Sequence, residues 1–402
     1  MIRKTDLWKP LTYLVIFLIP TQLAIHFWPS FAFVYGIRVD YLSPSIYLTD
    51  ILIWLLLILK PHKLITFLKR SSLVKLVLLV IAFNVFFSSG WIATSLRWLK
   101  LIEFALFSLL IYTNKKELSV NSIISSVLYS SSFFSLVGIC QFFIGKTTGL
   151  LWILGERSFT LSSPGIALVQ ILGQDFLRTY STFPHPNAFG GYLGTVLLFL
   201  FFQKKFPKST LNKILVAVVF VGFILTFSFS AVLAILLCLI VYFFYKKTIK
   251  NVIYIHLFFL SILASLTFPI YSRQLFGPSK ILGSVFSERV ELAFFAGKMI
   301  SAKFLFGEGL NAFIPNIPRF VGIENYSWLL QPVHNIFLLV FSEVGIIGFI
   351  FFSVVLYKLF KQANVYTKTI FLFVITTGLM DHYWLTLQQN NLWLAFLIGF
   401  LL

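Results

Sequence analysis

Long apolar stretches, separated by short polar or basic segments, run along almost the whole chain. A membrane-spanning helix needs about 20 predominantly apolar residues. On this measure the pattern predicts about twelve spans, at residues 10–28, 44–59, 72–90, 92–112, 120–144, 187–202, 213–228, 230–245, 251–269, 334–357, 366–381 and 388–402. We therefore predict an all-α, polytopic integral membrane protein in which residues 1–402 form a single transmembrane domain.

Two connections between these spans are much longer than the others, at about 145–186 and about 270–333. Each interrupts an apolar background with Gly, Pro, Asn and charged residues. Long structured loops are often functional. We expect these two segments to contain short helices and to form the active-site region.

The composition supports a membrane protein. Of the 402 residues, 59% are hydrophobic and only 11% are charged, and the mean hydropathy is +0.93. A soluble domain carries about 25% charged residues, so this chain has too few to cover a globular surface. Intrinsic disorder is excluded as well, because 49 Phe and nine Trp would not stay solvated. The two cysteines, Cys140 and Cys238, fit neither a zinc site nor a disulfide framework.

The net charge of +19 would ordinarily indicate a nucleic-acid partner. Its distribution instead reports membrane topology, because cytoplasmic loops collect Lys and Arg. One alternate set of loops holds 19 basic and two acidic residues, whereas the opposite set holds ten basic and eight acidic ones. This alternation predicts that both termini are cytoplasmic and that both long connections lie on the outer side. It leaves no reason to expect nucleic-acid binding.

The first polar cluster ends the first long connection. Arg178 is followed by Phe183-Pro184-His185-Pro186-Asn187, and the two prolines predict a stiff turn with Asn187 near the N-cap of the next span. A simple loop-to-helix junction explains this pattern. Alternatively, Arg178 and the free N–H groups of the helix start face an anion, which makes His185 and Asn187 candidate substrate-binding residues. Asp175 is close enough in sequence to pair with Arg178 and give it a structural role.

The second cluster surrounds His334, where the second long connection meets a span. Histidine is the natural base near neutral pH for taking a proton from a sugar hydroxyl. Asn335 follows directly, and Glu343 lies two to four turns further into the span. A capping or packing role for His334 is the competing interpretation. The position of His334 at the mouth of an outer cavity favours a functional role.

Two further motifs lie within the second long connection. Arg289, flanked by Glu288 and Glu291, opens an amphipathic stretch and either joins a surface ion-pair network or presents its guanidinium to a diphosphate. The sequence Gly307-Glu308-Gly309 lacks the Lys and the strand–helix context of nucleotide-binding loops. ATP and dinucleotide binding are therefore rejected.

Three ionisable residues, Arg97, Lys100 and Glu103, recur at three-residue intervals within a predicted span and so share one helix face. Ionisable residues inside a membrane are costly and are functional candidates by default. Glu103 can neutralise Lys100, which leaves Arg97 as either a lipid-phosphate contact or part of a structural network. The Asp381-His382 pair is interpreted as a cap at the outer surface.

Several of these motifs occur in a characteristic order. They are Arg178 with Ser181-Thr182-Phe183-Pro184-His185-Pro186-Asn187, then Ser228-Phe229-Ser230-Ala231, Arg289, Gly307-x-Gly309, His334-Asn335 and Glu343-x-Gly345-x-x-Gly348. The ordered set resembles the O-antigen ligase and O-antigen polymerase superfamily of bacterial glycan transferases. One departure is Phe229, at a position where the family usually has Arg.

The resemblance implies a fold similar to the membrane part of the GT-C glycosyltransferases. It also implies transfer of a glycan from undecaprenyl diphosphate to an acceptor hydroxyl on the outer face of the bacterial cytoplasmic membrane, without nucleotide, metal or other cofactor. Carried over by motif, Arg178 and Arg289 would bind the lipid diphosphate and His334 would be the base. The acceptor, whether a glycan, a lipid or a protein, stays open, as does the choice between ligase and polymerase. The rival class is a transporter or flippase of lipid-linked saccharides, against which the lack of internal repeats counts.

Overall fold

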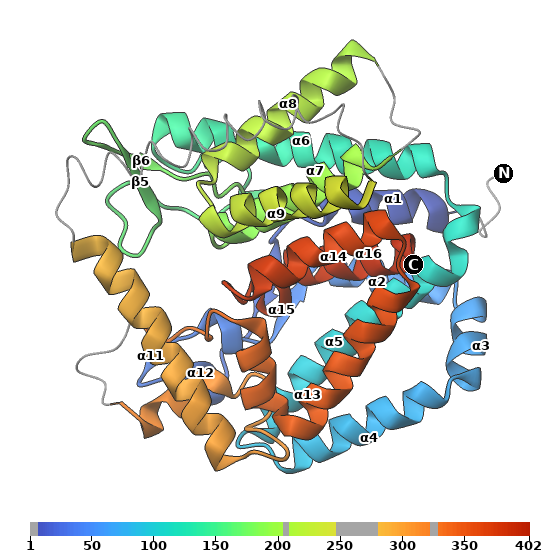
Figure 1. Cartoon of the computed structure of the whole chain (residues 1–402), viewed down its shortest axis with the longest axis vertical. Coiled ribbons are helices and arrows are strands. Elements are labelled where there is room, and N and C mark those ends of the chain that lie inside the picture. Colours follow the sequence, from blue (N-terminus) through green and yellow to red (C-terminus); the bar gives the residue numbers. More distant parts are fainter. Residues whose placement is uncertain (1–6, 204–208, 247–279, 322–328) are drawn as a thin grey trace.

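The computed structural model describes residues 7–203, 209–246, 280–321 and 329–402, and about 70% of it is helical (Figure 1). The α-helices are α1 (Trp8–Leu18), α2 (Leu48–Leu59), α3 (His62–Arg70), α4 (Ser72–Phe86), α5 (Trp91–Asn114), α6 (Val120–Ile144), α7 (Pro186–Phe201), α8 (Thr210–Leu225), α9 (Phe229–Lys246), α11 (Lys280–Ala302), α12 (Phe313–Asn316), α13 (Ile336–Gln362), α14 (Val365–Gly378), α15 (Tyr383–Thr386) and α16 (Gln388–Leu401). Short 3-10 helices are η2 (Ser30–Ala32), η3 (Asp40–Leu42), η4 (Lys115–Glu117), η5 (Trp152–Leu154) and η7 (Ile317–Arg319).

Every predicted span within the described residues overlaps with a helix, whereas the span at 251–269 lies outside them. The predicted number of twelve spans is not confirmed. By length and composition, α6 and α13 are long and apolar enough to cross a membrane, and α2 with α3 makes a third candidate if this pair, bent by 84°, is one broken span. Most of the other apolar helices are shorter than 18 residues, which is too short to count as a span by length.

The expectation of a purely α-helical chain needs correction, because three short antiparallel strand pairs are present. They are β1 (Ala24–His26) with β4 (Ser45–Tyr47), β2 (Phe33–Val34) with β3 (Ile37–Arg38), and β5 (Leu168–Ile171) with β6 (Gln174–Leu177). The first pair also corrects two boundaries: α1 ends at Leu18 instead of 28, and α2 begins at Leu48 instead of 44. Pro20 lacks an N–H and so cannot continue the helix, which frees the next segment to pair with β4.

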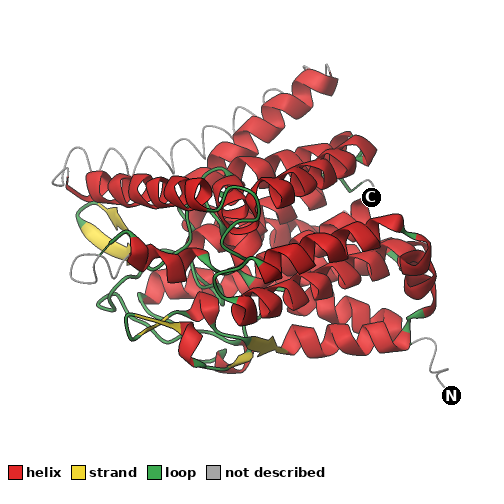
Figure 2. Cartoon of the chain, turned by 90° about the horizontal axis from the view of Figure 1, so that it is seen from below, coloured by secondary structure: helices red, strands yellow, loops and turns green. Residues whose placement is uncertain are grey.

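The strands gather at one end of the helix bundle, and α1 begins toward the other end (Figure 1 and Figure 2). Both long connections contribute to the strand-bearing end: the first carries η5 and the β5–β6 hairpin, and the second carries α12 and η7. The second connection also differs from the prediction of short helices only, because its α11 is 23 residues long. The amphipathic stretch that Arg289 opens lies within this helix.

The core that positions this end is built from large aromatic side chains where α7, α14 and α16 meet. Trp393 is fully buried, and its Nε1–H donates to Thr195 Oγ1 at 2.8 Å. Gly191 permits the close approach of Tyr383, because a Cβ at this position would lie 2.4 Å from the Tyr383 hydroxyl oxygen. This packing holds α15 and the residues on either side of it against the start of α7.

Candidate functional site

A cavity of about 1200 Å³ opens at the strand-bearing end of the bundle. Its wall is formed by the segment from β1 to β4, one face of α5, the turn around η5, and the chain from Asp381 to Gln389. Three of the predicted site residues line it, namely Arg97, His185 and His334. These residues come from three distant parts of the sequence, so the structure brings them into one site.

His334 lies just before α13, with 18% of its side chain exposed. Its Nδ1 is 3.5 Å from Asp381 Oδ1, which is the separation of an ion pair, and its Nε2 is 3.3 Å from Gln331 Oε1. The His382 ring lies beside it, with 5.1 Å between the ring centroids. The Nδ1 atom of the imidazole therefore faces a buried carboxylate, and the Nε2 atom faces Gln331.

Asp381 is buried, and its position contradicts the prediction that it caps the outer surface. Only 5% of the residue is exposed, and it accepts hydrogen bonds from the His382 N–H at 2.8 Å and from Asn187 Nδ2 at 3.1 Å. Burial acts to raise its pKa, but the contact with His334 holds the pKa well below its usual range. Asp381 is thus an ionised carboxylate at neutral pH.

His382 is the neutral member of the cluster. Burial lowers its pKa to about 4, although the charge of Asp381 acts in the opposite direction. Its Nδ1 lies 2.8 Å from Thr386 Oγ1 within α15. The sequence did show this adjacent Asp-His pair, but nothing in it placed the pair beside His334, which is 47 positions away.

His185 confirms the predicted stiff turn. It is the N-cap of α7, its Nδ1 accepts from the Asn187 N–H at 3.1 Å, and Pro186 occupies the first turn. The side chain faces the cavity. The protein packed around it, together with the charge of Arg178, lowers its pKa, so His185 contributes a neutral imidazole to the wall.

Arg178 and Asn187 lie behind this wall. The Arg178 guanidinium donates to Asn187 Oδ1 at 2.6 Å, to the Thr226 carbonyl at 2.7 Å and to the Phe227 carbonyl at 3.2 Å. Asn187 in turn links Arg178 to Asp381. The guanidinium therefore lies directly before the Ser228–Ala231 motif, in which Phe229 is half exposed and does not line the cavity. Arg273, a second arginine that could supply the charge missing at Phe229, lies outside the described residues.

Arg289 lies on α11, half-buried and outside the lining of the cavity. Its charge acts to lower the pKa of His382, so the guanidinium is within electrostatic reach of that ring. In the part of the chain that the structure describes, no hydrogen bond or ion pair engages Arg289. Its positive charge is thus available to an anion near the histidines.

Asn335 and Glu343 have structural contacts. Asn335 caps α13, because its Oδ1 accepts from the N–H groups of Phe337 at 2.9 Å and Leu338 at 3.1 Å. Glu343, 3% exposed, accepts at 3.3 Å from the Tyr41 hydroxyl and at 3.3 Å from the Phe313 N–H. Neither side chain lines the cavity, although Tyr41 does.

The two glycine motifs meet at a break in α13. Gly345 has φ 65° and ψ −175°, which interrupts the helix and frees backbone groups on either side. The turn at Gly307 and Gly309 fills the break: the Gly309 N–H donates to the Glu343 carbonyl at 2.8 Å, and the Ile346 N–H donates to the Phe304 carbonyl at 2.8 Å. This packing requires bare glycine, because a Cβ on Gly345 would lie 2.4 Å from the Leu305 carbonyl oxygen.

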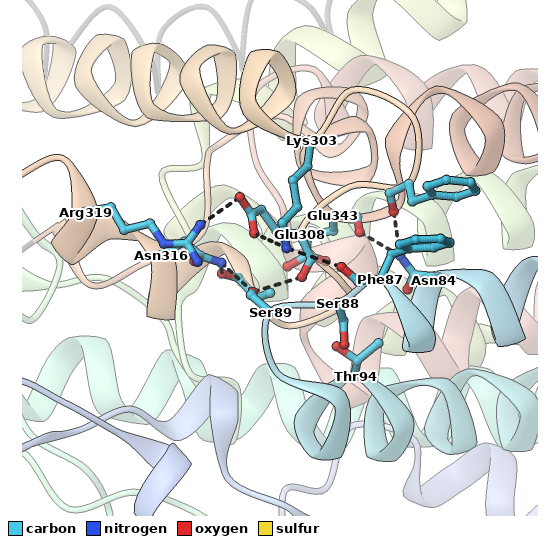
Figure 3. Close-up of polar contacts among 12 residues, drawn as sticks. Asn84, Phe87, Ser88, Ser89, Thr94, Lys303, Glu308, Asn316, Arg319 and Glu343 are labelled. Atoms are coloured by element: carbon cyan, nitrogen blue, oxygen red, sulfur yellow. Dashed lines mark hydrogen bonds and ion pairs between the residues drawn. The ribbon is translucent and has the colours of Figure 1, made fainter.

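Polar side chains surround this junction (Figure 3). Buried Glu308 pairs with Lys303 at 3.1 Å and with Arg319 at 3.0 Å. Asn84 Nδ2 donates to the Glu343 carbonyl at 2.9 Å. The Gly-x-Gly sequence is thus part of a helix junction, which agrees with the rejection of a nucleotide loop.

The same histidine cluster meets the spacing for a metal site. The ligand atoms of His334, Asp381 and His382 lie within 4.8 Å of one another. A carboxylate against one imidazole nitrogen is equally the arrangement by which an acid orients a general base. The prediction that the protein needs no metal therefore depends on whether these three residues bind a metal ion or orient a base.

Taken together, a largely helical and apolar chain with a polar, histidine-containing cavity at one end of its bundle defines a polytopic membrane protein with an enzyme-like site. Residues 214–353, from α8 into α13, match the protein family described as O-antigen ligase. This match supports the resemblance to the O-antigen ligase superfamily over that part of the chain. The family comprises multi-pass proteins of the bacterial inner membrane with ligase-type glycan transfer. No curated protein matches the chain.

Proposed function

We propose that the protein transfers a glycan from a polyprenyl diphosphate, undecaprenyl diphosphate being the expected carrier, to a hydroxyl group of an acceptor. The observation that carries the proposal is the contact of His334 with the buried, ionised carboxylate of Asp381 in a cavity that Arg97 also lines. A base beside a cationic group is what this reaction needs, because a proton leaves the acceptor while negative charge develops on the departing diphosphate.

We assign the Nδ1–H of His334 to the side that faces Asp381, so that Nε2 is the nitrogen that accepts a proton. The acceptor hydroxyl then takes the place beside Nε2 that Gln331 Oε1 now occupies at 3.3 Å. The acceptor oxygen attacks the anomeric carbon, and its proton passes to Nε2. The bond between that carbon and the phosphate oxygen breaks, and the electron pair leaves with the polyprenyl diphosphate. Attack from the face opposite the leaving group would invert the anomeric carbon, and an unchanged anomeric configuration in the product would contradict this step.

Positive charge stabilises the leaving diphosphate most in the transition state. Arg97 faces the cavity, and Arg289 has its charge near the histidines. Arg178 is bound to Asn187 and to backbone carbonyls. We therefore assign direct diphosphate contact to Arg97 and Arg289, and an indirect role to Arg178, which holds Asn187 against Asp381.

The cavity is assigned to the outer face of the inner membrane, with both termini in the cytoplasm. The distribution of basic residues supports this orientation. So does the presence of both long connections at the bundle end away from the start of α1 (Figure 2). A lipid-linked donor then reaches the site from the outer leaflet, and the acceptor is a glycan, lipid or protein presented on that side. Ligase and polymerase chemistry use the same steps and differ only in this acceptor.

The test uses purified protein in liposomes with a polyprenyl-diphosphate glycan and an envelope acceptor. Wild type and His62→Ala, altered in α3 far from the site, should give a covalently linked product, whereas His334→Ala should give none. Full activity of His334→Ala would refute the assignment of the base. Movement of the lipid-linked glycan across the bilayer without any linked product would instead favour a transporter.

A further inference from the structure

A second polar cluster lies in the wall of the same cavity, on the helices rather than at the histidine end. Lys100 and Glu103 project from α5, and Gln388 is the first residue of α16. Lys100 Nζ forms an ion pair with Asp50 of α2 and lies 3.4 Å from Glu103 Oε2, and Gln388 Nε2 donates to Asp50 Oδ1 at 2.6 Å. Asp50 is fully buried behind the wall, so Lys100, Glu103 and Gln388 are the members that face the cavity.

One oxygen of this cluster has no partner. Glu103 is 7% exposed, and among the described residues no hydrogen-bond donor reaches its Oε1, which is itself buried. A buried carboxylate oxygen without a donor is costly. The other polar atoms of the cluster are paired. Glu103 lines the cavity, so a small rotation of its side chain would present Oε1 to a ligand hydroxyl, which would satisfy it.

The charges select the chemistry of that ligand. Lys100 carries one positive charge beside the two carboxyl groups of Asp50 and Glu103, so the cluster has no excess of positive charge. Such a surface does not attract a phosphate. It suits a neutral, hydroxyl-rich group, whose O–H groups donate to Glu103 and whose oxygens accept from Lys100.

Aromatic side chains complete the surface. Tyr47 and Trp54 line the cavity beside the cluster, and Lys100 Nζ lies 5.3 Å from the centroid of the Tyr47 ring. Trp54 is 45% exposed. Aromatic faces with a few fixed polar groups are the usual composition of a small-molecule site. A sugar ring has both the apolar face and the hydroxyl edge that this surface can contact.

The cluster is connected to the histidine end through α15. This short helix starts next to His382 and leads to Gln388, and the Arg97 guanidinium, one helical turn from Lys100 on α5, donates to the Leu385 carbonyl of α15. We propose that Lys100, Glu103, Gln388 and Trp54 form a saccharide subsite that binds the acceptor sugar while its reacting hydroxyl lies at His334. This inference rests on the proposed function, and it divides the cavity into a diphosphate end and an acceptor end.

The experiment measures ligand binding and transfer separately. The probes are envelope oligosaccharide released by mild acid hydrolysis and inorganic pyrophosphate, each titrated onto the full-length protein in detergent. Glu103→Gln keeps the shape but removes the charge, and we expect it to weaken oligosaccharide binding about tenfold or more with pyrophosphate binding unchanged, because hydrogen bonds to charged groups are the stronger ones. Asp175→Asn, on the exposed hairpin strand β6, is the matched control and should change neither.

Trp54→Leu is the second variant, in case Glu103→Gln does not fold, and it should weaken the oligosaccharide alone as well. In transfer assays both variants should raise the KM for the acceptor and leave the KM for the donor unchanged. Unchanged oligosaccharide binding in either folded variant would overturn the subsite, as would an equal loss of pyrophosphate binding. Wild-type oligosaccharide binding without any transfer product would instead count against the proposed function, so the two failures are distinguishable.

Discussion

Replacing Asp381 by Asn gives the sharpest test of the site. The substitution keeps the size of the side chain and an oxygen that accepts one of the present hydrogen bonds, from the His382 N–H at 2.8 Å or Asn187 Nδ2 at 3.1 Å. It removes the negative charge 3.5 Å from His334 Nδ1. The imidazolium that forms when His334 takes the acceptor proton then has no counter-charge.

The magnitude follows from that distance. At an effective dielectric constant of about 20, two unit charges 3.5 Å apart attract by about 5 kcal/mol. Each tenfold change in rate corresponds to about 1.4 kcal/mol in the barrier. We therefore expect Asp381→Asn to lower kcat by about three to four powers of ten.

The assay is the initial rate of glycan transfer in liposomes, measured for wild type, for Asp381→Asn and for Asp175→Asn as the exposed control. If Asp381 acts through His334, the double variant with His334→Ala is no slower than His334→Ala alone, because residues that act as a unit are not additive. A rate within threefold of wild type for a folded Asp381→Asn protein would refute the reasoning. If Asp381→Asn, Asp175→Asn and His334→Ala all lost the same transfer rate and all had lower unfolding temperatures, the loss would reflect folding alone.

Three further predictions concern pH, metal and the helix break. Folded His382 stays neutral down to about pH 4 while the unfolded residue charges near 6.5, so acid between these values should destabilise the protein through His382 by at most about 3 kcal/mol, in addition to the effects of His185 and Asp381. His382→Gln should remove the His382 share of this dependence in unfolding temperatures, and an unaltered profile would contradict it. Transfer should survive EDTA dialysis, and loss restored by a divalent cation would assign His334, Asp381 and His382 to a metal. Gly345→Ala should destabilise by about 2 kcal/mol or more, whereas Gly297→Ala, whose Cβ meets open space in α11, should be neutral or stabilising; equal unfolding temperatures would refute the argument.

Much of the helical framework was predictable because the apolar runs of the helices are long and local. The helices α6 and α13 match their predicted spans closely, and the N-cap at His185 follows from the two prolines beside it. The boundaries of α1 and α2 were not predictable in this way. The β1–β4 pairing joins segments about 20 residues apart. Apolar residues such as Ile25, which the first predicted span includes, therefore lie in a strand instead of a helix.

The site residues likewise divide into those that the sequence could select and those whose contacts only the structure shows. Residue type and position on the chain were enough to select His334 and Arg97, because an ionisable group in or beside a span is costly unless it is used. The chain alone could not pair His334 with Asp381, or Lys100 with Asp50, since each pair joins distant helices. It also could not show that Arg178 and Asn335 are occupied by capping and backbone contacts.

The sequence by itself indicated a helical membrane protein, and it predicts basic loops on one side of the membrane and chemistry-bearing motifs on the other. These properties depend on local hydropathy and charge, which act through the bilayer and need no particular packing. Only the tertiary structure decided which of the motifs share a cavity, because that depends on where distant helices meet. The packing of α15 against the start of α7 buries Asp381 beside His334, and this contact, more than any single motif, defines the site.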